Sequence, residues 1–295
     1  MSVMETALLE LPKQSATGPY LKIVPPSGWA ALRLRDVWRF RDLLLALASR
    51  DVKLRYKQTA LGVIWVVLQP LIAAAVFAFV FIRIAQLPTD GVPSMLFMYV
   101  GLLGWNLFSG TVTKISTCLT GNSQLISKIF FPRLVLPLSA VPSVLIDFVV
   151  AGAMLILMML MYRYPPHLGI LLLPVWIAML LLMSLGIGLI TAALTVSYRD
   201  VQYILPVIIQ ILMYGSPIAY SVKTVFMHLK PKYQWIYMAN PLSAVLEAFR
   251  SSLLGTPWPP QLPLALLYSG CLSVGMFLIG AYTFKRMERR FADVI

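Results

Sequence analysis

Residues 135–162 read VLPLSAVPSVLIDFVVAGAMLILMMLMY, and this stretch decides the fold class. Its 28 residues contain a single charged side chain, that of Asp147. A helix needs about 20 mostly apolar residues to cross the hydrocarbon core of a membrane, so this stretch is long enough to do so. One such run could also be the buried helix of a soluble core, but this one is not alone in the chain.

Five more apolar runs of similar character accompany residues 135–162. With 59% hydrophobic and only 12% charged residues, the chain has about half the charged share of a soluble domain. It could not cover its surface with polar groups in water. The sequence therefore predicts an all-α polytopic membrane protein with six transmembrane helices. The predicted spans are residues 61–85, 93–112, 135–162, 169–196, 201–219 and 262–284.

The distribution of Lys and Arg predicts the orientation. With six spans, both ends of the chain lie on one side of the membrane. Of the 24 Lys and Arg residues, ten precede Leu61, four follow Phe284, and four lie in the two loops on that same side. Because basic residues are enriched on the cytoplasmic side, both termini are predicted to be cytoplasmic. This topology accounts for the net charge of +13, and no nucleic acid is expected as a partner.

The segment before the first span, residues 1–60, is predicted to be cytoplasmic and to contain an amphipathic helix. Between Leu34 and Tyr56, apolar residues recur at helical spacing among basic ones. Such a helix suits the headgroup layer, with its cations against anionic membrane lipid; a solvated helix with one apolar face is the alternative. Residues 285–295 are predicted to form a basic cytoplasmic tail. The residues assigned to the interface helix are Arg50, Asp51, Lys53, Arg55 and Tyr56.

Residues 221–260 are too polar to span the membrane. Within them Asn240 is a good N-cap, Pro241 a good first helical residue and Gly255 a good stop, which predicts a helix over 241–254. A helix of this length reaches only about 21 Å, so it can dip into the membrane without crossing it. We expect a re-entrant hairpin on the outer side. Its candidate functional residues are Asn240, Pro241, Glu247 and Arg250.

The sequence contains no recognisable catalytic constellation. It has two histidines and no Gly-x-x-x-x-Gly-Lys-Ser/Thr phosphate loop for ATP. We therefore expect no catalytic residue, cofactor or metal in this chain, and any ATP and Mg²⁺ to be bound by a partner. Asp147 is either a proton or ion site or a carboxylate hydrogen-bonded to a neighbouring helix. The lack of further intramembrane acids or histidines favours the second reading.

Several short motifs follow one another along nearly the whole chain. They are RDVKLRYKQTALGVIW (residues 50–65), NSQLISKIFFPR (122–133), SYRDV (197–201), SPI (216–218), and NPL followed by EAFR (240–242 and 247–250). In this order they resemble motifs of the permease subunits of polysaccharide-export ABC transporters. Those are the O-antigen and teichoic-acid exporters of the type-2 ABC membrane family.

The resemblance implies a function and a mechanism. In that family two copies of the permease pair around a channel in the bacterial cytoplasmic membrane, and two separate ABC ATPase subunits dock on the cytoplasmic side. ATP hydrolysis then drives a lipid-linked polysaccharide outward. Residues 120–131 correspond to a coupling helix that contacts the ATPase, together with the turn between the fourth and fifth spans. The residues thereby assigned to ATPase coupling are Asn122, Leu125, Ile126, Lys128, Ile129, Phe131, Arg133, Arg199 and Asp200.

The identity of the cargo stays open from the sequence. The same scaffold could export another cargo, such as a capsule polymer, a lipid or a drug. A secondary transporter without an ATPase is a further alternative, against which the missing ion relay argues. A glycan needs aromatic planes along its path, although Tyr and Trp at span ends are often interfacial anchors. The aromatic residues considered for a glycan path are Tyr99, Trp105, Phe108, Tyr214 and Tyr220.

Overall fold

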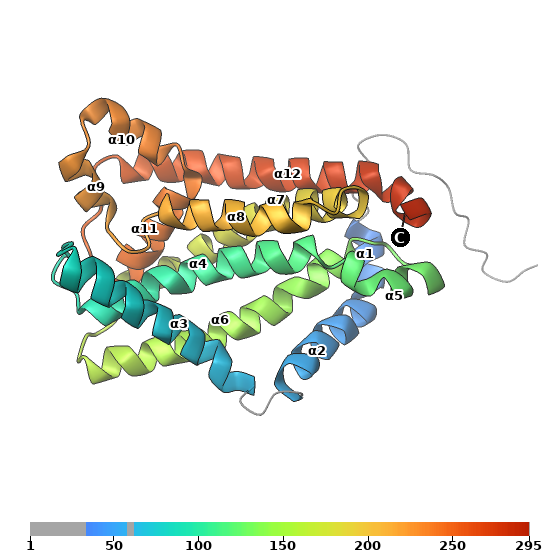
Figure 1. Cartoon of the computed structure of the whole chain (residues 1–295), viewed down its shortest axis with the longest axis horizontal. Helices are drawn as coiled ribbons and strands as arrows, with labels where there is room; N and C mark the ends of the chain where they lie inside the picture. The colour runs from blue at the N-terminus through green and yellow to red at the C-terminus, as the bar shows by residue number, and fades with distance from the viewer. Residues whose placement is uncertain (1–33, 58–61, 295) are drawn as a thin grey trace, which may run out of the picture. The chain divides into compact units, whose positions relative to one another are not determined.

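The computed structural model describes residues 34–57 and 62–294 (Figure 1). Within these ranges every regular element is a helix, which confirms the predicted all-α class. Most of the predicted N-terminal segment, residues 1–33 and 58–60, lies outside the described part, as does Leu61. The side chains of Arg55 and Tyr56 are also outside it, although both residues belong to a helix.

The chain builds twelve α-helices within the described residues, together with three short segments of other helical type. In chain order they are α1 (Leu34–Arg39), α2 (Arg41–Lys57), α3 (Gly62–Phe77), the π-helix η2 (Ala78–Ile84), α4 (Ser94–Ser116), the 3-10 helix η3 (Thr120–Asn122), α5 (Ser123–Lys128), α6 (Val135–Met161), the 3-10 helix η4 (Leu168–Leu172), α7 (Leu173–Ser197), α8 (Val201–Tyr214), α9 (Val222–His228), α10 (Pro231–Met238), α11 (Pro241–Leu254) and α12 (Leu262–Val294).

Five helices of the described part are long and apolar enough to cross a membrane. They are Ile64–Ile84, Ser94–Ser116, Val135–Met161, Leu168–Ser197 and Leu262–Glu288. A polytopic membrane protein is thereby confirmed. The count of six spans stays a prediction, because the remaining apolar helix, α8, has only 14 residues.

The predicted fifth span, residues 201–219, ends earlier than expected. Helix α8 stops at Tyr214, and residues 215–220 are irregular. The reason is local: Pro217 has no backbone N–H to donate and disfavours helical geometry at Ser216 before it. The last helix, in contrast, is longer than the predicted span over residues 262–284. The predicted tail, residues 285–295, continues α12 as a helix as far as Val294, and Phe291 in it is fully buried.

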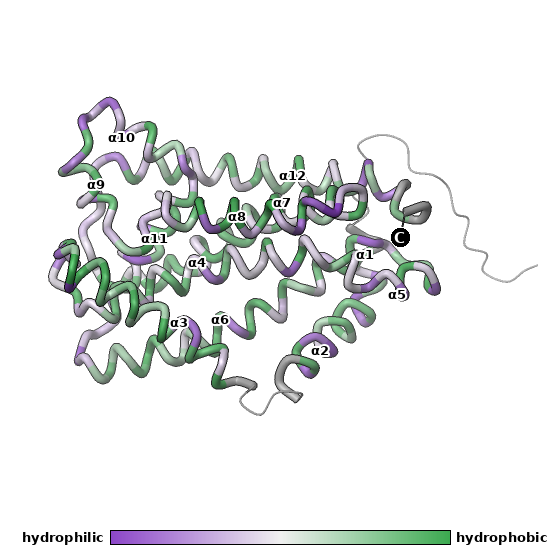
Figure 2. The backbone as a smooth tube through the Cα atoms, viewed as in Figure 1, coloured by the Kyte–Doolittle hydropathy of each residue, from purple (hydrophilic) through white to green (hydrophobic). Residues whose placement is uncertain are grey.

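Helix α4 is the centre of the structure, and the helices around it are apolar on the outside. In α4, 78% of the most apolar stretch is buried inside the protein. The share of the most apolar stretch that is buried is only 17% for the first span and 28% for α6, α7 and α12. Figure 2 shows hydrophobic residues along these peripheral helices. An apolar exterior of this kind fits lipid as the solvent, because water would favour polar residues there.

Helix α2 packs onto the other helices of the protein. It packs against α6, and Leu47 and Ala48 are buried. Phe40, Leu43 and Leu44 pack against the same cluster of buried side chains. Arg50 and Lys53 on its other side are exposed. A helix therefore forms over Arg41–Lys57 and packs part of its apolar surface onto the protein itself, while its place at a membrane surface stays a prediction.

Helices α7 and α12 share the most extensive packing contact of the described structure. Two glycines allow their backbones to approach closely. A Cβ atom added to Gly280 on α12 would overlap backbone atoms of Gly186 on α7. One added to Gly186 would lie 2.5 Å from the carbonyl carbon of Met276. Small residues are the usual means by which membrane helices pack this closely.

We expect Gly280→Ala to destabilise the protein by about 1–3 kcal/mol, because the added methyl group overlaps backbone that cannot rotate away. The unfolding midpoint of the detergent-purified protein measures this. Gly275→Ala on the same helix is the matched control, since nothing lies within 4 Å of its added methyl group. It should keep or raise the midpoint. Equal losses in both variants would contradict the close α7–α12 approach.

Candidate functional site

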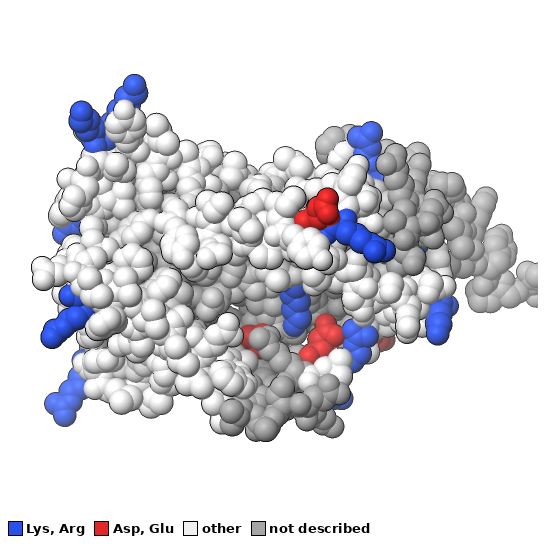
Figure 3. Space-filling model, in the orientation of Figure 1, with Lys and Arg blue, Asp and Glu red and all other residues white. Residues whose placement is uncertain are grey.

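The structure has two opposite ends, and the predicted site residues divide between them. Helix α5 and the C-terminal end of α12 lie at one end, with α9 and α10 at the other (Figure 1). On the face shown in Figure 3, Lys and Arg side chains gather at both ends. Most of the predicted coupling residues lie at the α5 end.

Residues 120–133, which we call the coupling segment, expose a small apolar surface. Leu125 and Ile126 are half-buried against the neighbouring core cluster, and Phe131 is buried. In contrast, Ile129 is 52% exposed and Phe130 is 69% exposed. The helix ends at Lys128 and the backbone of Ile129 is extended, so the next two side chains project from the end of the helix. The exposed apolar pair is therefore Ile129 and Phe130, whereas the sequence pattern favoured Leu125, Ile126 and Ile129.

One end of the coupling segment is bonded to helix α2. The guanidinium of Arg50 donates a 2.7 Å hydrogen bond to the Asn122 side-chain oxygen and pairs with Asp51 at 3.0 Å. The Asn122 amide nitrogen in turn donates to the carbonyl of Cys118 at 2.8 Å. Burial raises the pKa of the Cys118 thiol, so that group stays protonated. Residues assigned separately to the interface helix and to coupling are thus in direct contact.

The other end of the coupling segment is bonded to α12. The backbone N–H of Arg133 donates to the Glu288 carboxylate at 3.3 Å, and its guanidinium donates to the Glu288 carbonyl at 3.0 Å. The same guanidinium lies 5.9 Å from the centre of the Phe291 ring. Lys285 forms an ion pair with Glu288. Arg133 is therefore held by the protein itself and is not a free docking cation.

The other predicted coupling residues are exposed. Lys128 is the last residue of α5, and Arg199 and Asp200 form the turn between α7 and α8. Exposure leaves all three side chains available to a partner. Glu288 was missed by the sequence reasoning, because it lies 155 residues from Arg133 and no local pattern links them.

At the opposite end, Asn240 and Arg250 hold the irregular stretch after α8. The Asn240 side-chain nitrogen donates to the Gly215 carbonyl and to the Ser216 hydroxyl, both at 3.2 Å, while its oxygen caps α11 by accepting from Leu242 N–H at 3.1 Å. Pro241 occupies the first turn of α11, as predicted. The stretch also lies close to α4, since a Cβ atom at Gly101 would be 2.6 Å from the Ile218 carbonyl oxygen.

Glu247 and Arg250 form a buried ion pair. Their side chains are 3% and 1% exposed, and the charged atoms lie 3.0 Å apart. Arg250 also donates to the carbonyls of Tyr220, at 3.1 Å, and of Pro217. Its guanidinium carbon lies 4.3 Å from the centre of the Phe97 ring. Both charges are thereby compensated, which a buried pair requires.

Helix α11 is buried along nearly its whole length, from Leu242 to Leu254. Its bounds agree with the helix predicted over 241–254, and Gly255 ends it in the left-handed conformation at φ 70°. Helices α9 and α10 precede it in the region predicted to be re-entrant. Whether this region dips into the membrane stays a prediction.

The aromatic residues considered for a glycan path differ in how far they are exposed. Tyr99, Trp105 and Phe108 are at most 3% exposed, and the Tyr99 hydroxyl donates to the Ala151 carbonyl at 3.0 Å. Rings packed in this way have no face left for a sugar, so these three residues support the packing of α4. Tyr220 is half-buried and donates to the carbonyl of Tyr214 at 2.9 Å. Of the five, only Tyr214 is strongly exposed, at 58%.

Helix α8 presents Tyr214 on a continuous exposed face. Tyr203 on the same helix is 78% exposed, and Gln210 is also exposed. Positions 203, 210 and 214 fall on one side of a helix with 3.6 residues per turn. Two phenol rings and one amide thus line up on a helix in which only Leu205 is buried. We call this set the α8 tyrosine face.

The intramembrane carboxylate of Asp147 is not isolated. It is half-buried and interacts with other groups of the protein. On the same helix, Ser143 forms a hydrogen bond with Lys114 of α4. Lys114 itself lies within α4, not in the loop where the sequence count placed it. A polar contact between α4 and α6 fits the reading of Asp147 as a structural carboxylate.

No group of three potential metal ligands is found among the described residues.

Comparison with known proteins agrees with this architecture. An O-antigen export system permease protein from Myxococcus xanthus is 26% identical over 262 residues, which are 89% of this chain and 98% of that protein. A protein of the same description from Klebsiella pneumoniae is 26% identical over 261 residues, 86% of this chain and 95% of its own length. A polysialic acid transport protein from Escherichia coli is 27% identical over 219 residues, 71% of this chain and 80% of its own length.

The family match is broader than any single motif. Residues 42–254 match the ABC-2 type transporter family, a range that begins in α2 and ends with the last residue of α11. It includes the coupling segment, the α8 tyrosine face and the buried pair of α11. The resemblance seen in the motifs is thus confirmed at the level of the family: this chain belongs to the ABC-2 type transporters.

Proposed function

We propose that this chain is the membrane subunit of an ATP-driven exporter that moves a lipid-linked polysaccharide across the bacterial cytoplasmic membrane. The family supports a transporter subunit, and the relatives named for O-antigen export and polysialic acid transport support a polysaccharide as cargo. The chain has no phosphate loop, so ATP and Mg²⁺ would be bound by a separate ATPase subunit. The observation that carries the proposal is the exposed Ile129–Phe130 pair on an anchored segment.

The Ile129–Phe130 pair is suited to a cleft on a partner protein. Two large apolar side chains at the end of a short helix provide a small buried anchor, and such anchors carry most of the affinity of an interface. The exposed Lys128 beside them can steer docking through charge complementarity. The distribution of Lys and Arg predicts that this end is cytoplasmic, and ATP is available there.

The two anchors of the coupling segment give a route from the ATPase to the membrane helices. A displacement of the segment acts on α2 through the Arg50–Asn122 bond and on α12 through the Arg133–Glu288 bonds. Helix α2 precedes the first span along the chain, and α12 is the last span. Movement at the segment can therefore reach the first and last spans together.

The α8 tyrosine face is the best candidate for contact with the polysaccharide. Exposed Tyr rings offer apolar planes for sugar C–H groups, and their hydroxyls and the Gln210 amide offer polar contacts. We propose that two copies of the chain pair so that this face lines a shared channel, with two ATPase subunits beneath. The exposed apolar surfaces of α3 and α8 leave room for such pairing.

The docking role predicts that Ile129→Asp combined with Phe130→Asp weakens ATPase binding by at least about 100-fold, because an unpaired charge would be buried in the cleft. Co-purification of the ATPase from membranes and glycan at the cell surface measure this. Met227→Asp is the control, since Met227 is 68% exposed but belongs to α9 at the opposite end. Normal complex and export in the double variant would place the docking surface, and the proposed orientation, in doubt.

The transmission role predicts a different defect for the Arg50–Asn122 bond. Asn122→Leu removes the acceptor for Arg50 at similar size, so we expect export to fall several-fold while the ATPase still co-purifies and hydrolyses ATP. Asn122→Asp keeps an acceptor and adds a charge attractive to Arg50, so it should export close to the wild-type level. If Asn122→Asp is as defective as Asn122→Leu, the bond does not transmit.

Contact between the α8 tyrosine face and the polysaccharide predicts that loss of the rings reduces export and leaves assembly with the ATPase unchanged. Replacing Tyr203 and Tyr214 together with Leu keeps apolar volume but removes the rings, and we expect export to fall by about tenfold, about 1.4 kcal/mol. ATPase co-purification should not change. Tyr233→Leu on α10 is the matched control, as Tyr233 is 49% exposed and outside this face. Unchanged export in the double variant would remove α8 from the glycan path.

A further inference from the structure

A cavity of about 580 Å³ lies beside the π-helix at the end of the first span. This end is the one that the Lys and Arg distribution predicts to be external. Four of the lining residues belong to η2, one to the segment that follows it, and one is the first residue of α4. They are Ala78, Phe79, Ile82, Arg83, Gln86 and Ser94.

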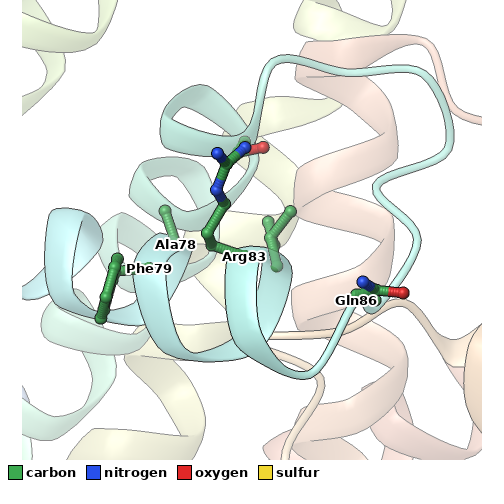
Figure 4. A pocket seen from close by; sticks show the side chains of 6 residues that line it. Ala78, Phe79, Arg83 and Gln86 are labelled. Carbon is green, nitrogen blue, oxygen red and sulfur yellow. The ribbon is translucent and has the colours of Figure 1, made fainter.

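The lining is divided into an apolar wall and a polar edge. Ala78, Phe79 and Ile82 form the wall, and Phe79 is 60% exposed, so the wall is continuous with the apolar exterior of the helix. Arg83 and Gln86 bring a cation and an amide to the edge, as Figure 4 shows for the last turn of the π-helix and the segment after it. A molecule that fits both parts has an apolar chain and an anionic polar group.

Arg83 is available for such a group. It is exposed, and no hydrogen bond or ion pair joins it to the residues that the structure describes. The carboxylate in the loop that follows, Asp90, lies 3.8 Å from Lys223 of α9 and is therefore already paired. A guanidinium carries planar donors that match phosphate oxygens, and at the end of a membrane span it reaches the level of the lipid phosphates.

The π-helix supplies most of the cavity lining. Seven residues, Ala78–Ile84, leave α-helical winding after Phe77, and four of them line the cavity. π-Helical turns within spans are rare and frequent at functional sites. This π-helical segment therefore brings both apolar side chains and the Arg83 cation to the cavity.

We propose that this cavity binds the phosphate group of a lipid, with Arg83 on the phosphate and the lipid chain along Phe79 and Ile82. Two sources share this chemistry. One is a phospholipid of the outer leaflet. The other is the phosphate that joins an exported glycan to its lipid carrier, and this source rests on the proposed function.

Lipid binding to the detergent-purified full-length chain, measured by native mass spectrometry, tests the site. The probes are phosphatidylglycerol, a polyprenyl phosphate, and diacylglycerol as a lipid without phosphate. We expect both phosphate lipids to bind the wild-type protein at least about tenfold more tightly than diacylglycerol. Arg83→Gln should lose that preference, and Arg83→Lys should keep most of it.

Arg163→Gln is the matched control, because Arg163 is another exposed Arg between spans at the same predicted side but does not line the cavity. Binding that is equal for all three lipids, unchanged in Arg83→Gln, or equally reduced in Arg163→Gln overturns the proposal. A preference for polyprenyl phosphate identifies the carrier as the source, and equal or tighter binding of phosphatidylglycerol identifies the membrane. Glycan export by the wild-type protein is measured separately, so its absence contradicts the proposed function without affecting the lipid comparison.

Discussion

The buried guanidinium of Arg250 supports the part of the chain where the helical backbone is interrupted. In a membrane protein, backbone carbonyls released from a helix need donors within the protein. After α8 the chain is irregular over residues 215–220, and Arg250 donates to the carbonyls of Pro217 and Tyr220. Glu247, 3.0 Å away, compensates its charge. The end of α8, and with it the position of the tyrosine face, therefore depends on this ion pair together with Asn240, which donates to Gly215 and Ser216.

The packing divides the molecule into an enclosed centre and an exposed apolar periphery. Helix α4 is enclosed, with its aromatic residues between neighbouring helices. The surfaces suited to partners, cargo and lipid lie on the outside, at the coupling segment, on α8 and beside the π-helix. The coupling segment joins the two regions, because it follows α4 along the chain while its side chains bond to α2 and α12. A stable α4 can thus hold its place while the outer helices respond to a partner.

Much of this arrangement could be predicted from the sequence where the signals are local. The bounds of α11 follow from Asn240, Pro241 and Gly255, and the long apolar runs give five of the helices. The contacts between distant segments could not be predicted, since nothing near Arg133 points to Glu288. The aromatic residues of α4 show a second limit. In a helix that is apolar on all sides, hydropathy does not distinguish a ring that faces lipid from one that faces the core. The sequence pattern therefore does not exclude Tyr99, Trp105 and Phe108 from a glycan path, whereas their burial does.

Helix α12 has a mechanical consequence that follows from its length. It runs without interruption for 33 residues, from Leu262 beside the buried α11 to the terminal turns that hold Arg133. At 1.5 Å per residue it is a rod of about 50 Å, and a tilt of about 5° displaces its far end by about 4 Å. A small rotation at one end of such a helix displaces the other end by about one atomic diameter, with no change in its own hydrogen bonds.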